Sequence, residues 1–533
     1  MIFCGLFFFA LRYPQAYSFD NRWLLRLNPV SGILTFIASH RIIAGYAITV
    51  PAVVVLTGVF GRIFCGFFCP LGAVVDFSDR FIFRGLRRPE RRPPIGLHGL
   101  KYILLTGIAL AAVAGVLFPL FFDPLSIFSR FLTVFIYPLP ALAGNLVAPL
   151  TAVLDSTRTP PMLPLFYGGI GIGLLFFAVL AGGLWDRRFW CQYICPTGAF
   201  LGLLSRFTLF RRVADANACS ECTACAKICP TRAIPEKDFR RTSGAECILC
   251  GQCIPTAKSC TRFGFAGHRR GDTVGPDFGK RHLIGGAAAS VLLLPLIKAN
   301  AMSRRDNTGR LIRPPGALPE EIFNARCLAC GQCMKVCPTN AIQPCGFDDG
   351  FERWSTPKIV PRIGACEEKC HICGSVCPTG ALRVLPYDEK RFAKLGTAVV
   401  DKHRCLAWSQ NKECLVCQEV CPYHAIDPKM AMTTRGMFRV PDVYEDLCMG
   451  CGQCEKECPI GDTAAIVVFK FGENRIVTGP YLTAEQKKEI IDRRNRDFSS
   501  VNDSASLPEE GSAPSVKSPA PATGSAGAST GDE

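Results

Sequence analysis

The sequence predicts a multi-domain protein with an α-helical transmembrane segment followed by two cysteine-rich α+β modules. Three observations predict this class. Long apolar runs without a charged residue occupy the N-terminal part, most of the 30 cysteines fall into groups of four, and four of these groups recur at near-constant intervals. The chain has 533 residues, is 49% hydrophobic and carries a formal net charge of +16. Because the basic residues flank the apolar runs, this charge favours a membrane protein over a nucleic-acid-binding one.

Three apolar runs predict the transmembrane helices. They cover residues 42–60, 102–122 and 164–184, and each is long enough to cross ~30 Å of hydrocarbon as a helix. Buried helices of a soluble protein are the alternative. The loop 61–101 holds eight Lys or Arg and the loop 123–163 holds two, so the positive-inside rule predicts that 61–101 faces the cytoplasm, as does 185–212.

The remaining boundaries follow from composition. The apolar run 127–154 contains prolines and is expected at the outer membrane surface or as a re-entrant segment. Residues 283–297 are shorter, follow Lys280-Arg281-His282 and precede Ala299-Asn300-Ala301, as in an export signal, with a buried helix as the alternative. The predicted units are 1–212 (transmembrane domain), 213–265 (two-cluster module), 266–301 (linker), 302–480 (four-cluster domain) and 481–533 (a basic helix, then a tail disordered beyond about Arg496).

Twenty-four cysteines form six quartets. They are Cys219, Cys222, Cys225 and Cys229; Cys247, Cys250, Cys253 and Cys260; Cys327, Cys330, Cys333 and Cys337; Cys366, Cys370, Cys373 and Cys377; Cys405, Cys414, Cys417 and Cys421; and Cys448, Cys451, Cys454 and Cys458. The spacing C-x2-C-x2-C-x3-C-P is that of bacterial ferredoxins, in which three thiolates hold one [4Fe–4S] cluster and the fourth reaches the neighbouring cluster. The two modules are therefore predicted to be ferredoxin-like, with six [4Fe–4S] clusters and these cysteines as iron ligands.

The pairing rule gives specific ligand sets for the first two quartets. Cys260 is expected to complete the set of the first run, and Cys229 that of the second. Thr261 stands where the pattern has proline, which makes the Cys260 site the more irregular one. The four later quartets begin at steps of 39, 39 and 43 residues, so 302–480 is predicted to be a four-fold internal repeat. Zinc, disulfides and c-type haem fit these spacings less well.

Two further cysteine pairs lie at the ends of predicted membrane helices. Cys65 and Cys69, and Cys191 and Cys195, both have the pattern C-x3-C-P and are predicted on the cytoplasmic face. They are candidate redox thiols that share a metal, form a thiol redox site or line a quinone pocket; buried free thiols at two helix starts are the alternative. Cys4 and Cys345 are predicted to be structural. Gly169 and Gly173 are predicted to let membrane helices approach closely.

Two pairs of segments resemble known electron-transfer families. GRIFCGFFCPLGAVVD and WCQYICPTGAFLGLLSR are similar to the NapH and MauN membrane ferredoxins. LIRPPGALPEEIFNARCLACGQCMKVCPTNAI and GTAVVDKHRCLAWSQNKECLVCQEVCPYHAI are similar to the NapG and MauM four-cluster ferredoxins. The chain resembles a fusion of the two. The resemblance implies that the membrane part takes electrons from quinol and that residues 302–480 pass them on in the periplasm.

The predicted function is that of a multi-pass inner-membrane polyferredoxin. It carries electrons between the quinol pool and a redox partner such as a periplasmic reductase of the nitrate-reductase type, or a cytochrome. It is predicted to be an electron-transfer subunit, and it could serve as a component of a quinol dehydrogenase. No nucleic acid is expected as a partner. The alternatives are an assembly factor that handles a metal at the C-x3-C-P thiols and a cytoplasmic relay from ferredoxin to quinone.

Overall fold

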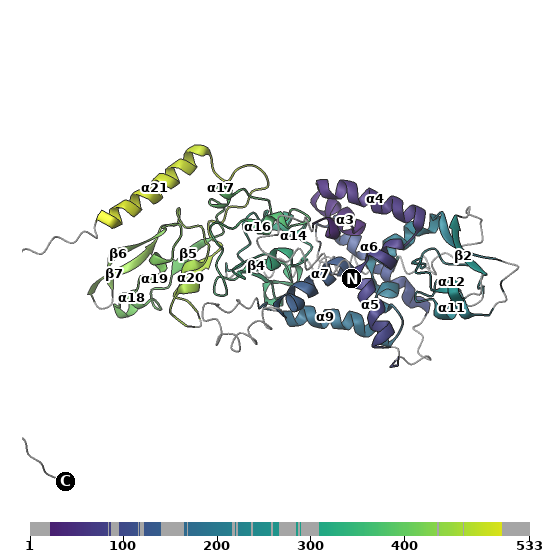
Figure 1. Ribbon diagram of the computed structural model, residues 1–533. Coiled ribbons are helices and arrows are strands. Elements are labelled where there is room, and N and C mark those ends of the chain that lie inside the picture. Colours follow the sequence, from purple (N-terminus) through teal and green to yellow (C-terminus); the bar gives the residue numbers. More distant parts are fainter. Residues whose placement is uncertain are drawn as a thin grey trace, which may run out of the picture.

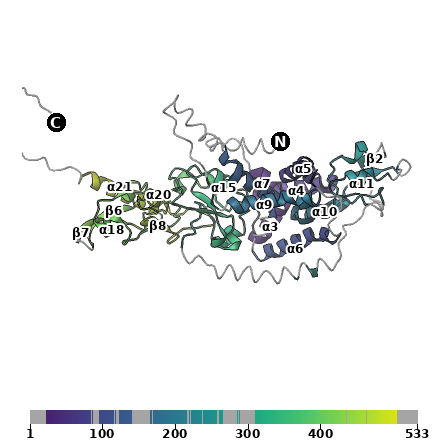
Figure 2. The ribbon, with the colours of Figure 1, turned by 90° about the horizontal axis from the view of Figure 1, so that it is seen from below.

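A group of helices lies at the centre of an elongated molecule, with a cysteine-rich module at each end (Figures 1 and 2). The structure, a computed structural model, describes residues 22–83, 85–86, 95–115, 117, 122–139, 165–167, 169–215, 219, 222–235, 238–256, 260–265, 284–285, 288, 309–433, 436–461 and 463–503. The predicted export-signal-like stretch 283–297 lies almost entirely outside the described residues. Cys4 and residues 504–533 also lie outside them.

The central helices begin at residues that cap them. Asn28 accepts a hydrogen bond from Val30 N at the start of α3, and Asp123 accepts one from Ser126 N at the start of α7, each with proline at the first helical position. The helices and helical turns are α2 (Arg22–Arg26), α3 (Pro29–Ser39), α4 (Ala44–Phe60), η2 (Phe64–Phe68), α5 (Pro70–Phe81), η3 (Ile95–Gly99), α6 (Leu100–Val113), α7 (Pro124–Phe131), η5 (Leu132–Ile136), α9 (Gly169–Ala181), η6 (Gly182–Leu184), η7 (Trp190–Ile194), α10 (Pro196–Leu204) and η8 (Ser205–Phe207).

The helices in the three predicted spans are shorter than the apolar runs. Helix α4 has 17 residues, α6 has 14 and α9 has 13. Gly61 and Gly115 adopt positive φ angles of 71° and 80° just after α4 and α6, a conformation that ends a helix. Within the described part of the chain, no helix combines the length and the apolar character needed to cross a membrane.

The predicted close approach at Gly169 and Gly173 is confirmed. A Cβ atom on Gly173 would lie 2.3 Å from the ring of Phe135, and one on Gly169 would lie 2.7 Å from Val134. Both contacts are too short for any residue larger than glycine without movement. Helix α9 therefore packs directly on η5 through its small residues.

The two-cluster module lies against one end of α4. Its strands β1 (Phe210–Ala214) and β2 (Thr261–Phe265) pair antiparallel, with the short helices α11 (Ala224–Ile228) and α12 (Cys253–Thr256) between them in sequence. Phe60, the last residue of α4, makes edge-on ring contacts with Phe210 at 5.7 Å and Phe265 at 6.5 Å. These contacts fix the module to the helices.

The four-cluster domain is built from short helices and two-stranded antiparallel sheets. The sheets pair β3 (Ile342–Pro344) with β4 (Pro357–Ile359), β5 (Thr397–Val400) with β8 (Ile466–Phe469), and β6 (Ile426–Thr433) with β7 (Gly436–Val443). The helices and helical turns are α14 (Glu320–Asn324), α15 (Gln332–Lys335), η9 (Phe347–Asp349), η10 (Phe351–Arg353), α16 (Ile372–Ser375), α17 (Tyr387–Lys390), α18 (Leu406–Gln410), α19 (Val416–Glu419) and α20 (Gln453–Glu457). Helix α21 (Ala484–Asp503) follows and continues past Arg496, where the sequence predicts disorder to begin.

Helix α7 joins the four-cluster domain to the central helices. Arg130 Nε donates to Ala329 O at 2.7 Å, and Ser129 Oγ donates to Cys330 O at 2.8 Å. Both side chains are about 1% exposed. The apolar run 127–154 is expected from the sequence at the outer membrane surface or as a re-entrant segment, and its described start is buried beneath the third cysteine quartet.

Candidate iron–sulfur sites

The third and sixth cysteine runs each curl at a glycine that adopts a left-handed backbone. Gly331 has a φ of 79° and precedes α15 in the third run, and Gly452 has a φ of 87° and precedes α20 in the sixth. Glycine accepts this conformation without strain. The tight curl turns successive thiols of one run toward the same side.

The third and fourth quartets exchange their last cysteines. Cys377 lies with Cys327, Cys330 and Cys333 around one pocket. Cys337 lies with Cys366, Cys370 and Cys373 around a second pocket. Each pocket therefore has three thiols from one run and a fourth from the other, as the ferredoxin spacing predicts.

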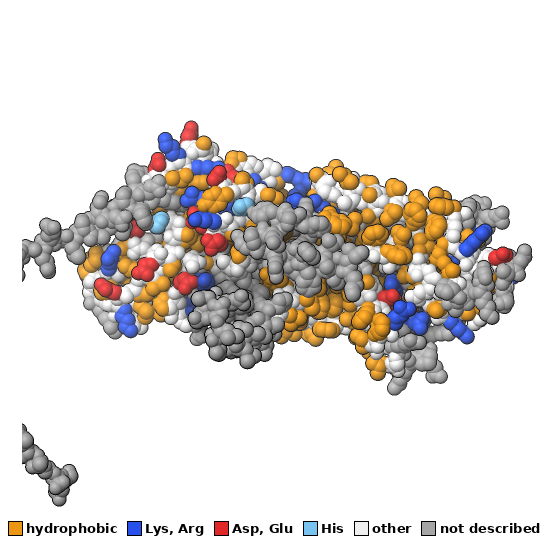
Figure 3. All heavy atoms as spheres, in the orientation of Figure 1, with side chains coloured by type: hydrophobic (Ala, Val, Ile, Leu, Met, Phe, Trp, Pro, Cys, Tyr) orange, Lys and Arg blue, Asp and Glu red, His pale blue; other side chains and the backbone are white. Residues whose placement is uncertain are grey.

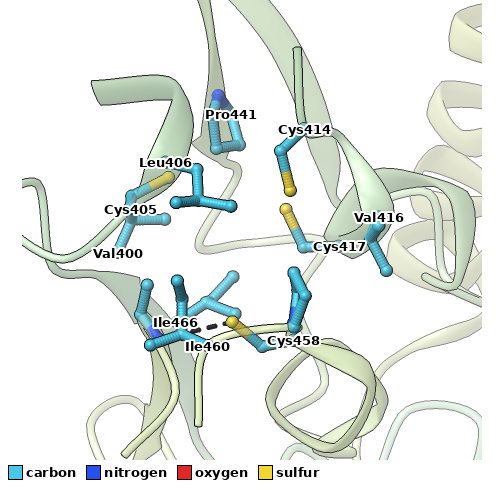
Figure 4. A pocket seen from close by; sticks show the side chains of 12 residues that line it. Val400, Cys405, Leu406, Cys414, Val416, Cys417, Pro441, Cys458, Ile460 and Ile466 are labelled. Atoms are coloured by element: carbon cyan, nitrogen blue, oxygen red, sulfur yellow. Dashed lines mark hydrogen bonds between the residues drawn. The ribbon is translucent and has the colours of Figure 1, made fainter. Parts of the chain in front are cut away.

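The fifth and sixth quartets show the same exchange. Cys405, Cys414, Cys417 and Cys458 line one pocket, with apolar side chains such as Leu406 around them (Figure 4). The thiols of Cys448 and Cys421 lie close enough to Cys451 to raise its pKa electrostatically, on top of the larger effect of burial. Cys421, the last cysteine of the fifth run, thus lies beside the cysteines of the sixth run.

The first two quartets lie in the two-cluster module, which is the smaller of the two cysteine-rich modules. Cys229 comes close to Cys247, Cys250 and Cys253, whose pKa values are raised by burial and by the Cys229 thiol. Cys225 and Cys260 share one apolar cluster with Cys253. Arg212 Nη2 donates to Cys225 Sγ at 3.6 Å, so a buried cation faces Cys225.

The thiols fit iron–sulfur clusters in their hydrogen bonds as well as in their grouping. Backbone N–H groups donate to sulfur from Ala233 to Cys229 at 3.3 Å and from Ala465 to Cys458 at 3.4 Å (dashed in Figure 4). Such bonds stabilise negative charge on a ligand sulfur. Among the described residues, no three His, Cys, Asp or Glu side chains form a site for a single metal ion; the thiols instead line pockets.

The two C-x3-C-P pairs are brought together by the central helices. Cys69, Cys191 and Cys195 pack in one apolar cluster, and Cys65 packs beside Cys69 in the adjoining one. Burial raises the pKa of the Cys195 thiol well above its ordinary value, and the thiols of Cys191, Cys65 and Cys69 raise it further. Cys345 lies apart from every quartet, buried beneath Arg313, whose Nη1 donates to its sulfur at 3.7 Å.

Buried arginines beside the thiols are further candidate site residues, which the sequence patterns alone did not point out. Arg62 and Arg188 are 1% and 4% exposed, and each stands three residues before the first cysteine of a C-x3-C-P pair. That repeated position was the available signal. Arg130, which contacts the third run, has no comparable signal because the contact joins distant parts of the chain.

Comparisons with known proteins find iron–sulfur family profiles in several segments of the chain. Residues 42–89, 167–214, 320–343 and 372–395 match profiles described as "4Fe-4S binding domain", and residues 412–461 match one described as "4Fe-4S dicluster domain". The first two of these segments contain the C-x3-C-P pairs. Clusters of the [4Fe–4S] type are therefore supported in several parts of the chain.

Several similar proteins are ferredoxin-type proteins. The methylamine utilization ferredoxin-type protein MauM of Methylophilus methylotrophus is 37% identical over 179 residues, which is 33% of this chain and 78% of MauM. MauM of Paracoccus denitrificans is 37% identical over 169 residues, 30% of this chain and 71% of that protein. The ferredoxin-type protein NapG of Escherichia coli is 36% identical over 194 residues, 34% of this chain and 80% of NapG. Through this third of its length, the chain belongs to the NapG and MauM family of ferredoxin-type proteins.

Proposed function

We propose that this protein is a membrane-bound polyferredoxin that carries single electrons between the quinol pool and a redox partner, with six [4Fe–4S] clusters. Four sets of ligands lie in the four-cluster domain and two in the smaller module. The sets are Cys219, Cys222, Cys225 and Cys260; Cys247, Cys250, Cys253 and Cys229; Cys327, Cys330, Cys333 and Cys377; Cys366, Cys370, Cys373 and Cys337; Cys405, Cys414, Cys417 and Cys458; and Cys448, Cys451, Cys454 and Cys421.

The exchange of the fourth cysteine between runs carries this proposal. A run that bound zinc or formed disulfides by itself would have no reason to send its last thiol to a neighbour. The exchange also ties each pair of sites into one folded unit. Bound clusters supply one-electron transfer at potentials that span about −700 to +450 mV and depend on burial and on hydrogen bonds to sulfur.

The sites of the four-cluster domain follow one another closely, as a relay requires. Burial raises the pKa of Cys333, and the nearby thiol of Cys373, from the set of Cys366, raises it further. Cys366 N donates to Cys451 O at 2.8 Å, which joins the set of Cys366 to the set of Cys448. Burial raises the pKa of Cys454, and the nearby thiol of Cys417, from the set of Cys405, raises it further. These contacts support a linear order of sites from the central helices to the far end of the domain.

The ends of the central helices support a location in the membrane. Helix α4 ends on the smaller module through Phe60, and Arg41 just before its start lies near Arg326 of the four-cluster domain. Helix α9 likewise begins beside Tyr167, whose N–H donates to Gln343 Oε1 at 3.0 Å. The two modules therefore lie at opposite ends of these helices, an arrangement that suits modules on opposite sides of a bilayer.

The outer surface of the helices supports the same location. On the face that Figure 3 shows, apolar side chains, drawn in orange, gather over the central helices. The exposed apolar side chains of this part of the chain include Ile42, Ile48, Val55, Val113, Ile170, Leu174 and Phe177. Exposed apolar surface of this extent is typical of contact with lipid or with another protein. In this arrangement the smaller module faces the cytoplasm and residues 302–480 face the periplasm.

The electron donor and acceptor come into the proposal from the resemblance to the NapH and MauN membrane ferredoxins and from the NapG and MauM relatives. Quinol is the proposed donor, and a periplasmic reductase of the nitrate-reductase type is the proposed acceptor. The test is bleaching of the iron–sulfur absorbance by quinol in membranes that contain the full chain. Bleaching that a reductase then reverses would support the proposal, and absorbance that quinol leaves unchanged would contradict it.

Two further measurements separate the alternatives. Iron analysis should give at least about 24 atoms per chain for six cubanes, and about 16 would remove two of them. Protease added to right-side-out spheroplasts should digest residues 302–480. Full protection of that domain would instead favour the cytoplasmic relay from ferredoxin to quinone.

A further inference from the structure

The two C-x3-C-P segments have the same sequence pattern and the same local structure. Both read R-x-x-C-x3-C-P-x-G-A, from Arg62 and from Arg188. In both, a π-helical turn (η2 or η7) ends at the second cysteine, and proline begins the next helix. The second cysteine then accepts a hydrogen bond from a glycine N–H, from Gly72 to Cys69 Sγ at 3.4 Å and from Gly198 to Cys195 Sγ at 3.3 Å.

The two segments also reach across to each other through their arginines. Arg188 Nη1 donates to Cys65 O at 3.4 Å, so the arginine of the second segment holds the first. Arg62 crosses in the opposite direction, and a Cβ atom on Gly198 would lie 2.8 Å from its Nη2. The segments are thus two halves of one reciprocal arrangement rather than two separate sites.

Four thiols meet in this arrangement. Cys69, Cys191 and Cys195 belong to one apolar cluster with Trp190 and Leu71, and Cys65 packs beside Cys69. Burial raises the pKa of Cys69, and the thiols of Cys191 and Cys65 raise it further. None of the four forms a disulfide.

Cys69 and Cys195 also share the backbone of the exchanged cysteines in the ferredoxin quartets. Their φ and ψ angles are −76° and 112°, and −61° and 113°; those of Cys229 are −62° and 116°. The pattern C-P-x-x-A follows all three, and C-P-T-G-A occurs at both Cys195 and Cys377. The second cysteine of each half is therefore placed as a cluster ligand is placed elsewhere in the chain.

We infer that Cys65, Cys69, Cys191 and Cys195 together hold a seventh [4Fe–4S] cluster. This inference rests on the proposed function only in that the protein carries iron–sulfur clusters. The two separate profile matches at 42–89 and 167–214 become two halves of a single site, each half supplying two thiolates.

The charges around the site suit a cluster. Four thiolates around an oxidised cubane core carry about two negative charges in total. Arg62 and Arg188, both almost fully buried, bring two positive charges to the same place, and Arg188 also pairs with Asp76 at 3.3 Å through Nε. Arg62 pairs with Glu246 at 3.0 Å through Nη1, while its buried Nε has no hydrogen-bond partner in the described structure.

On one side, the seventh site adjoins the smaller module. A Cβ atom on Gly66, between Cys65 and Cys69, would lie 2.4 Å from Ile248 O, which is next to Cys247. Gln192 Nε2, next to Cys191, donates at 3.2 Å to Pro230 O, next to Cys229. Both contacts lead to the same ligand set, that of Cys247, Cys250, Cys253 and Cys229.

On the other side, the site connects to the four-cluster domain. Asn28 Nδ2 donates to Thr197 Oγ1 at 3.1 Å, two residues after Cys195, and also to Asp123, which caps α7. Ser129 of α7 in turn donates a hydrogen bond from its hydroxyl to Cys330 O. The seventh cluster would thus link the two modules, with one electron entering from one side and one leaving on the other, and with no bond made or broken.

Iron content of the purified full chain tests the inference. We expect about 28 iron atoms in the parent and about 24 in the quadruple variant Cys65→Ser, Cys69→Ser, Cys191→Ser, Cys195→Ser. The matched control is Cys345→Ser, a buried cysteine outside every set, which should keep the parent value. Equal iron in the quadruple variant and the parent would overturn the inference, and a loss of about two atoms would overturn the cubane. A parent without iron would instead refute the proposed function.

A second pair of variants keeps all the cysteines. Arg62→Gln removes a buried positive charge and should lower the midpoint potential of one paramagnetic centre in an EPR redox titration, because the reduced cluster carries more negative charge. Arg62→Lys keeps the charge and should leave that potential much closer to the parent value. The shifted centre should be the one that the quadruple variant lacks. If Arg62→Gln shifts no centre, or a centre that the quadruple variant retains, the inference is wrong.

Discussion

The four-cluster domain and the central helices gather their thiols in different ways. In the four-cluster domain, each site takes three thiols from one short run and one from a neighbouring run, as at Cys327, Cys330, Cys333 and Cys377. In the central helices, two segments far apart in sequence each contribute a pair, at Cys65 and Cys69 and at Cys191 and Cys195. The first arrangement is mostly local and the second depends on tertiary packing.

This difference teaches where sequence spacing is informative. A local run sets most of its site by backbone geometry, so the packing around it mainly has to deliver one more thiol. The paired segments need α5, α10 and the crossing arginines Arg62 and Arg188 to be in place before any site exists. A site of the second kind should therefore be more sensitive to packing of the helices than a site of the first kind.

The largest expected effect is a loss of iron from variants that test the exchange of cysteines in the four-cluster domain. If Cys377 completes the set of Cys327, the double variant Cys377→Ser, Cys327→Ser should lose about four iron atoms, because both changes remove the same cluster. The double variant Cys377→Ser, Cys366→Ser should lose about eight, because it removes two. Iron analysis of the purified variants measures both values.

Each double variant serves as the control for the other, since both lack Cys377 and one further ligand. The reverse result, with the larger loss in Cys377→Ser, Cys327→Ser, would mean that each run holds its own cluster. Each site of the four-cluster domain would then take all four thiols from one run. The difference from the central helices, where two distant segments contribute, would be larger than the structure indicates.

Much of the molecule could be predicted from sequence where spacing acts locally. The six quartets, the repeat that begins at Cys327 and the close approach at Gly173 all follow from residue type and spacing, and GRIFCGFFCP already suggested a shared site with its counterpart. The lengths of the helices could not be predicted, because an apolar run does not reveal that a left-handed Gly115 ends α6. The docking of Arg130 on the third run joins distant segments and leaves no periodic signal.

An intermediate effect is expected from crowding the helix contact at Gly173. Gly173→Ala places a methyl group about where the Phe135 ring lies, since the Cβ would be 2.3 Å from a ring carbon. Overpacking of this kind typically costs about 1–3 kcal/mol of unfolding free energy. Thermal unfolding in detergent, followed by loss of the iron–sulfur absorbance, measures the change.

Gly58→Ala in α4 is the matched control, because a Cβ atom there meets nothing within 4 Å. Alanine in place of a helical glycine should raise stability by up to about 1 kcal/mol. Equal effects of the two variants would show that the close approach of α9 to η5 does not contribute to stability. The central helices would then be less dependent on packing than the comparison with the four-cluster domain suggests.

The smallest expected effect is a dependence of stability on pH at the junction of the helices with the smaller module. Burial lowers the pKa of His98, Lys101 and Arg232 lower it further, and Glu246 and Asp186 act in the opposite direction. Because the folded pKa is depressed, the neutral ring contributes stability above the unfolded pKa of about 6.5, and this contribution is lost as pH falls below it. His98→Gln should therefore flatten the fall in the thermal midpoint between about pH 7.5 and 5.5, whereas His403→Gln, at an exposed site, should keep the parent slope. If both variants keep that slope, protonation of His98 does not weaken the junction, and the packing at His98, whose ring lies 4.6 Å from that of Tyr193, tolerates a buried charge.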